Sequence, residues 1–169
     1  MSVAAKLAWI ILALVVWALA FVLIPRQRFV KLLPYGLYGG FLVALAIQLM
    51  GVPLLKLWAF RNVVAPLFGI PLFLLLAYAA EAMLFANFLP SGPVSVAVYI
   101  LVFALINILV NYGVLQTGLQ VHVRWNMVYT TLVAILSHVV LYSLYLLLLE
   151  PDLGQTQPAR TTQPSRRER

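Results

Sequence analysis

Glu81 is the residue of this chain best placed to do chemistry. It is the only acidic residue in the first 149 positions, and it lies inside the apolar stretch 66–89. A charged carboxylate at the centre of a membrane costs about 2.5 to 3.5 kcal/mol on insertion scales, so it normally faces a partner, a cavity or a proton route. Its neighbours at 77–82 read AYAAEA, and such small side chains let another helix approach closely. We therefore expect Glu81 to point into a helix bundle.

His138 is the second candidate, at the middle of the apolar stretch 127–149. On a helix, residues three and four apart share a face. Thr131, His138 and Tyr142 fall at such spacings and predict one polar stripe, while Asn107 and Asn111 form a shorter stripe four residues apart. Tyr78 is the hydroxyl nearest to Glu81 on its own helix.

Polar groups on three consecutive helices therefore predict a buried polar pocket. In this hypothesis Glu81 and His138 form a protonatable pair, and Tyr78, Asn107 and Tyr142 serve as hydrogen-bonding relays or ligand contacts. The alternative is that Glu81 is neutral and bonded to a neighbouring helix, and that the other polar groups join helices at about 0.6 kcal/mol each. A helix over 63–89 puts Glu81 about five residues, or about 7.5 Å, past the middle of its span.

Composition identifies the kind of protein that must hold these residues. Of the 169 residues 64% are hydrophobic and only 9% are charged, and the mean hydropathy is +1.04. A soluble domain averages about 25% charged residues. We therefore predict an all-α integral membrane protein, a bundle of five transmembrane helices at 1–150 with a disordered basic tail at 151–169. The predicted spans are 7–24, 33–52, 63–89, 94–115 and 127–149; a cleaved signal peptide is the rival interpretation of the first.

Glycine and proline positions suggest how the spans pack. Gly36 and Gly40 are four residues apart, so they lie on one helical face and favour close helix packing. Pro71 would lie more than one turn inside the third span. There it should bend or locally break the helix and act as a fixed bend or a hinge.

Charge distribution predicts orientation. The net charge is +7, but the eleven Lys and Arg residues lie almost entirely in connections and in the tail. That is a membrane-topology pattern, so we expect a lipid bilayer and no nucleic acid as the partner. Seven of these charges fall on the side of the C-terminus and four on the side of the N-terminus. The positive-inside rule then predicts a cytoplasmic C-terminus and an external N-terminus.

Several kinds of chemistry lack the residues they need. The chain has no cysteine, which excludes thiolate nucleophiles, disulfides and Cys-based metal sites. One carboxylate with two separated histidines, His122 and His138, is too few ligands for a di-metal site. We therefore predict no metal and no cofactor.

Two segments, PLFGIPLFLLLAYAAEAMLFANFLP at 66–90 and VRWNMVYTTLVAILSHVVLY at 123–142, resemble a family of small five-span membrane proteins from endospore-forming bacteria. That family commonly has Gly before the Trp that precedes the last span, where this chain has Arg124. The family has no established activity. The resemblance implies five-span topology and a bacterial plasma membrane.

Three functions fit these observations. The first is a non-enzymatic protein that binds a small amphiphile, or takes part in proton-coupled transport, at the Glu81 and His138 pocket. The second is a membrane enzyme that acts on a lipid or isoprenoid with Glu81 as general acid. The third is a structural or assembly subunit. The sequence leaves open whether the chain forms a homo-oligomer or joins a partner membrane protein.

Overall fold

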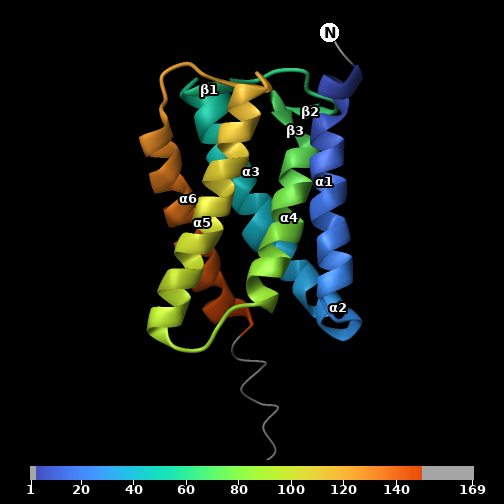
Figure 1. The fold of residues 1–169 in the computed structure, drawn as a ribbon, viewed down its shortest axis with the longest axis vertical. Helices are drawn as coiled ribbons and strands as arrows, with labels where there is room; N and C mark the ends of the chain where they lie inside the picture. The colour runs from blue at the N-terminus through green and yellow to red at the C-terminus, as the bar shows by residue number, and fades with distance from the viewer. Residues whose placement is uncertain (1–2, 150–169) are drawn as a thin grey trace, which may run out of the picture.

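The computed structural model describes residues 3–149, and these fold into an antiparallel bundle of five helical rods (Figure 1). The first rod is α1 (Val3–Leu23), and the second runs through α2 (Arg26–Tyr35), η1 (Gly36–Leu42), α3 (Val43–Leu49) and η2 (Met50–Leu54). The last three are α4 (Leu72–Asn87), α5 (Pro93–Gln116) and α6 (Met127–Leu148). The predicted tail, 151–169, lies outside the described residues.

Three of these rods, Arg26–Leu54, Pro93–Gln116 and Met127–Leu148, are long and apolar enough to cross a membrane. Leu7–Leu23 and Leu72–Asn87 are shorter apolar helices. The helices near 7–24, 94–115 and 127–149 start and end within a few residues of the predicted spans. The five helices therefore match the predicted number and order of apolar segments.

The second rod begins earlier than the predicted span 33–52. It starts at Arg26 and keeps its helical path through Pro34. Arg26, Arg28 and Lys31 are exposed at its first turns, where long charged side chains can reach water while their stems cover apolar surface. The charges that suggested a connection therefore belong to the end of a helix. η1 and η2 are π-helical, and η2 contains Pro53, which has no backbone N–H to donate.

The prediction of a single helix over 63–89, bent at Pro71, is wrong. The segment before α4 is a hairpin of two short strands, β2 (Pro66–Leu67) and β3 (Ile70–Pro71), which pair antiparallel. Phe68 and Gly69 form its turn at φ of 54° and 81°, the backbone conformation that tight two-residue hairpins require. Pro71 has extended backbone at the N-cap of α4, so it lies before the helix and not inside it.

α4 is the central helix. α1 and η1 pack along it, and buried residues occur on all its faces. Gly36 and Gly40 make the contact with η1 possible: a Cβ at Gly36 would lie 2.7 Å from Met83 Cγ, and one at Gly40 would overlap the backbone of Tyr78 and Ala79. The predicted glycine face is thus the face that contacts α4.

Two connections close one end of the bundle. β1 (Trp58–Phe60) and β4 (Gln120–His122) pair antiparallel, with Trp58 opposite His122. β1, β2 and β3 lie at the end where α1 begins, and the connection between α1 and α2 lies at the opposite end (Figure 1). The pairing ties the segment before α4 to the segment between α5 and α6.

Candidate functional site

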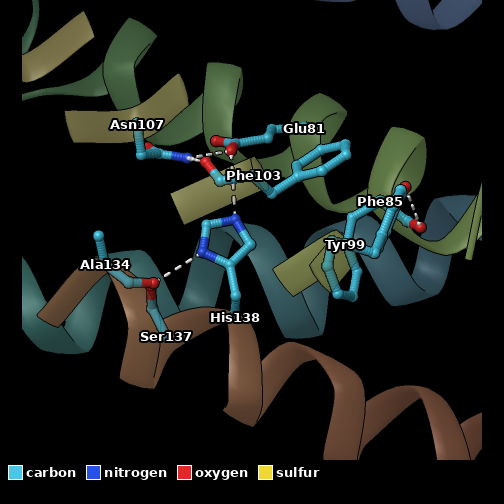
Figure 2. Close-up of polar contacts among 8 residues, drawn as sticks. All are labelled: Glu81, Phe85, Tyr99, Phe103, Asn107, Ala134, Ser137 and His138. Carbon is cyan, nitrogen blue, oxygen red and sulfur yellow. Dashed lines mark hydrogen bonds and ion pairs between the residues drawn. The ribbon is translucent and has the colours of Figure 1, made fainter. Parts of the chain in front are cut away.

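Glu81 lies close to the middle of α4 because this helix begins only at Leu72. The position is about one to two residues, or about 2 Å, past the helix midpoint. The predicted offset of five residues was wrong because it counted the hairpin as helix. The Glu81 side chain is 20% exposed, and it faces α5 and α6 (Figure 2).

Asn107 and His138 both contact the Glu81 carboxyl group. The Nδ2 amide of Asn107, from α5, donates a hydrogen bond to Glu81 Oε1. His138 Nε2, from α6, lies 3.6 Å from the same oxygen. The structure therefore brings together the three residues that the sequence placed on three separate helices (Figure 2).

The contact of Nδ1 determines which ring nitrogen of His138 carries the hydrogen. Nδ1 lies 2.7 Å from the carbonyl oxygen of Ala134, which can only accept a hydrogen bond, so Nδ1 carries the hydrogen. In the neutral ring Nε2 is then a bare acceptor, and it faces a carboxyl oxygen. At 3.6 Å these two acceptors are too far apart for a hydrogen bond, and Nε2 has no hydrogen-bond partner among residues 3–149. Glu81 and His138 therefore offer two acceptors side by side.

Aromatic rings close the site toward the C-terminal end of α4. Phe85 and Phe103 lie 5.5 and 5.9 Å from the His138 ring, centroid to centroid. The Tyr99 ring packs at a tilt against both phenylalanines, and its hydroxyl donates to the Phe85 carbonyl oxygen at 3.0 Å (Figure 2). These rings leave the polar groups facing the other half of the bundle, where the strands lie.

A cavity of about 110 Å³ extends from the pair between the second rod and α6, and we call it the His138 cavity. Its polar lining includes Gln48, Asn111, Gln120 and Ser137. Asn111 donates to Gln120 Oε1 at 3.0 Å. Gln48 and Gln120 are 8% and 6% exposed, which is rare for glutamine and indicates that the cavity interior is polar.

Two tryptophans contribute to the same cavity. Trp58 Nε1 donates to Gln48 Oε1 at 2.9 Å, and its indole lies 4.9 Å from that of Trp125 in an edge-to-face arrangement. Trp125 in turn donates to Thr130 Oγ1 at 2.9 Å. A Cβ at Gly51 would overlap the Trp58 ring, so only glycine leaves room for it there. Hydrogen bonds to Gln48 and Thr130, and the contact between the two rings, therefore fix both indoles.

A second cavity of about 260 Å³ lies between α1, α4 and α5, and we call it the Trp9 cavity. It shares six residues with the His138 cavity: Gln48, Tyr78, Glu81, Asn107, Asn111 and Gln120. Every other residue that lines it is apolar or aromatic, as Leu12, Leu84 and Ile106 are. Glu81 and Asn107 therefore lie on the boundary between a polar and an apolar cavity.

The predicted site residues do not all reach this boundary. Tyr78 and Asn111 line both cavities. Thr131 and Tyr142 line neither: the Thr131 hydroxyl donates to the Met127 carbonyl oxygen at 2.9 Å, and Tyr142 packs against the core beside Leu141. Of the predicted stripe on α6 only His138 lines the cavity, and the hydroxyl residues that face it are Thr130 and Ser137.

Sequence reasoning missed Gln48, Gln120 and the two cavity tryptophans. Gln48 could have been found, because it is a lone amide in an otherwise apolar stretch. Gln120 and Trp58 could not, because both reach the site only through the β1–β4 pairing of two connections.

His122 belongs to β4 and not to the pair. Burial lowers the pKa of His122 below its usual 6.5, and its Nε2 atom is buried without a hydrogen-bond partner among residues 3–149. In that same part of the chain no three His, Cys, Asp or Glu residues cluster as metal ligands would.

Comparison with protein-family models, curated proteins and solved structures finds no match to this chain. Function has to be inferred from the site.

Proposed function

We propose that this chain is a five-span membrane protein that binds a small amphiphile at the Glu81 and His138 site and couples binding to a proton. The observation that carries the proposal is the position of Glu81. It is the lone acidic side chain of the described helices, and it lies where a polar cavity meets an apolar one.

The two cavities suit the two ends of an amphiphile. A polar head needs hydrogen-bonding partners, and the His138 cavity supplies amide, hydroxyl and imidazole groups. A hydrocarbon chain needs an apolar lining, and the Trp9 cavity supplies one between α1 and α5. Helices that cross a membrane expose such a space to lipid chains, so a membrane amphiphile could enter from the side.

The ionisable groups of Glu81 and His138 support coupling to pH. When a ligand displaces or supplies a proton at such groups, its affinity depends on proton concentration. Asn107 stays bonded to Glu81 in either state, because a carboxyl oxygen accepts from the amide whether or not the group is ionised.

The membrane and the orientation are part of the same proposal. The resemblance to proteins of endospore-forming bacteria favours a bacterial plasma membrane. Arg26, Arg28 and Lys31 lie at the end of the bundle opposite the strands, on the side that the positive-inside rule makes cytoplasmic together with the tail. The strands and the start of α1 would then face outside.

Native mass spectrometry of the purified protein in gentle detergent tests this function. We expect wild type to retain an amphiphile and Glu81→Gln, which is nearly isosteric, to lose it while remaining folded. Tyr142→Phe, outside both cavities, is the matched control and should retain it. Equal ligand content in wild type and Glu81→Gln would contradict the proposal.

The same samples distinguish the two other functions. An enzyme with Glu81 as general acid would accumulate an unreacted lipid in Glu81→Gln that wild type does not hold. An assembly subunit would co-purify with one fixed partner protein, and neither substitution would change that partner. Either result would replace ligand binding as the function.

A further inference from the structure

We infer that the head group of the bound amphiphile is a primary ammonium, and that it donates hydrogen bonds to Glu81 and to His138 Nε2. This inference rests on the proposed function and names its ligand class. It is carried by the charges and the unpaired acceptors of the site.

The charge balance of the site favours a cation. Glu81 is the only acidic residue that lines either cavity, and among residues 3–149 no Lys or Arg lines them. The remaining titratable groups on the walls are His138 and Tyr78. A carboxylate without a fixed counter-ion in a site of low dielectric attracts a cation strongly and repels an anion. A ligand that carries its own positive charge completes the site.

The unpaired atoms of the site are acceptors. His138 Nε2 and Asn111 Oδ1 are buried without a hydrogen-bond partner among the described residues. The neutral His138 ring, which is only 3% exposed, offers Nε2 as a lone-pair acceptor. With the Glu81 carboxylate, the His138 cavity thus provides three kinds of acceptor. A primary ammonium has three N–H donors and no acceptor, which is the complementary set.

The aromatic walls are compatible with the same head group. Trp58, Trp125 and Tyr78 line the His138 cavity. An ammonium near the face of an indole is attracted by the charge distribution of the ring. A carboxylate or a phosphate gains no such attraction.

The Trp9 cavity accommodates the hydrocarbon chain. Along α1 its lining runs from Trp9 to Leu19, which is about 15 Å at 1.5 Å per residue. Ile106 and Val110 of α5 form the facing wall, and each is partly exposed on the outside of the bundle. An extended alkyl chain can lie in this space while its head group remains at Glu81.

Charge balance supports the same head group. An ammonium bound to the Glu81 carboxylate gives the site no net charge. The neutral His138 ring, with its hydrogen on Nδ1, accepts a second N–H bond from the ligand at Nε2.

Binding to protein in phosphatidylcholine nanodiscs, compared with empty discs, tests the inference. Dodecylammonium, dodecanol and dodecanoate share one chain and differ in head group, and quenching of the cavity tryptophans reports binding. At neutral pH we expect dodecylammonium to bind about tenfold or more tightly than dodecanol, because its hydrogen bonds are charge-assisted. Dodecanoate should not bind above the level of empty discs.

Three variants separate the parts of the inference. Glu81→Gln should reduce dodecylammonium binding to the level of dodecanol. Ile106→Trp, at a partly exposed residue that lines the Trp9 cavity, should fill this cavity and weaken the binding of both dodecylammonium and dodecanol. Tyr142→Phe should behave as wild type. If Glu81→Gln does not fold, the head-group preference of wild type still decides between the outcomes.

The failures are distinguishable. Equal affinity for dodecanol and dodecylammonium would overturn the ammonium inference and leave amphiphile binding intact. Preference for dodecanoate would overturn it as well. No binding of any probe above empty discs would contradict both this inference and the proposed function.

Discussion

The Nε2 atom of His138 lies 3.6 Å from Oε1 of Glu81, while Nδ1 of the same ring is bound to the Ala134 carbonyl oxygen at 2.7 Å. The second contact fixes the hydrogen on Nδ1, and the first then places two acceptors face to face. This relationship leaves Nε2 without a hydrogen-bond partner among residues 3–149, and it brings the polar groups of α4 and α6 together.

Asn107→Leu should weaken amphiphile retention more than it weakens folding. The substitution keeps the approximate volume but removes the amide that donates to Glu81. An unmet hydrogen bond to a buried acceptor costs about 1 to 3 kcal/mol. Native mass spectrometry should show reduced ligand, and thermal unfolding in detergent should show a modest loss of stability.

Thr131→Val is the control for that variant, because Thr131 bonds only to its own helix and lines neither cavity. It should retain ligand as wild type does. Loss of ligand in Thr131→Val with retention in Asn107→Leu would place the site on a different face of α6.

Gly40→Ala should destabilise the bundle. A Cβ at this position overlaps the backbone of Tyr78 and Ala79, so η1 and α4 must move apart. Overpacking of this kind costs about 1 to 3 kcal/mol. Thermal unfolding should report the loss as a lower midpoint.

Gly113→Ala is the matched control, since a Cβ at Gly113 has nothing within 4 Å. Gly113 lies within α5, where alanine is favoured over glycine by up to about 1 kcal/mol. An unchanged or higher midpoint is expected. Equal losses in the two variants would show that the η1–α4 contact is not tight.

Trp58→Phe should lower both stability and ligand retention. It removes the donor to buried Gln48 and leaves that amide oxygen unpaired, at a cost of about 1 to 3 kcal/mol. Trp17→Phe removes a comparable bond, to the Leu76 carbonyl oxygen at 3.0 Å, away from both cavities. Trp17→Phe should therefore lower stability alone, and native mass spectrometry distinguishes the two. Ligand loss in both variants would mean that general destabilisation releases the ligand.

His122 predicts a loss of stability in acid. Burial lowers the pKa of His122 in the folded chain below the 6.5 of the unfolded chain. Between these two values the unfolded chain binds more protons than the folded chain. The contribution of neutral His122 to the free energy of unfolding is therefore full above about pH 6.5, and it declines as the pH falls through the folded pKa. The unfolding midpoint of wild type should drop over this range, and the drop should be smaller in His122→Gln. Parallel curves would contradict the prediction.

The number of helices and the contact among Glu81, Asn107 and His138 could be predicted from the sequence. The start of α4 could not. Glu81, Asn107 and His138 each interrupt an apolar stretch, and such residues must find one another in a bundle, so their meeting follows from composition. The hairpin 66–71 did not follow, because its residues are as apolar as those of α4. Only Pro66, Pro71 and the turn residue Gly69 distinguish it, and prolines also occur in membrane helices.

Details of the cavity walls depended on tertiary pairing. Trp58 and Gln120 are 62 positions apart and come together because β1 pairs with β4. No local pattern encodes that pairing in strands of three residues. Thr131 was preferred to Thr130 because spacing alone does not determine which of two adjacent faces of a helix turns inward.

Photo-crosslinking tests the binding site most directly. A dodecylammonium probe that carries a diazirine on its chain would be bound in nanodiscs, irradiated and mapped by peptide mass spectrometry. We expect labels on Leu12 and Ile106, in the Trp9 cavity, and their loss in Glu81→Gln. Equal labelling of Leu14, Val22 and Leu132, which are exposed apolar residues outside both cavities, with no change in Glu81→Gln, would contradict a site at Glu81.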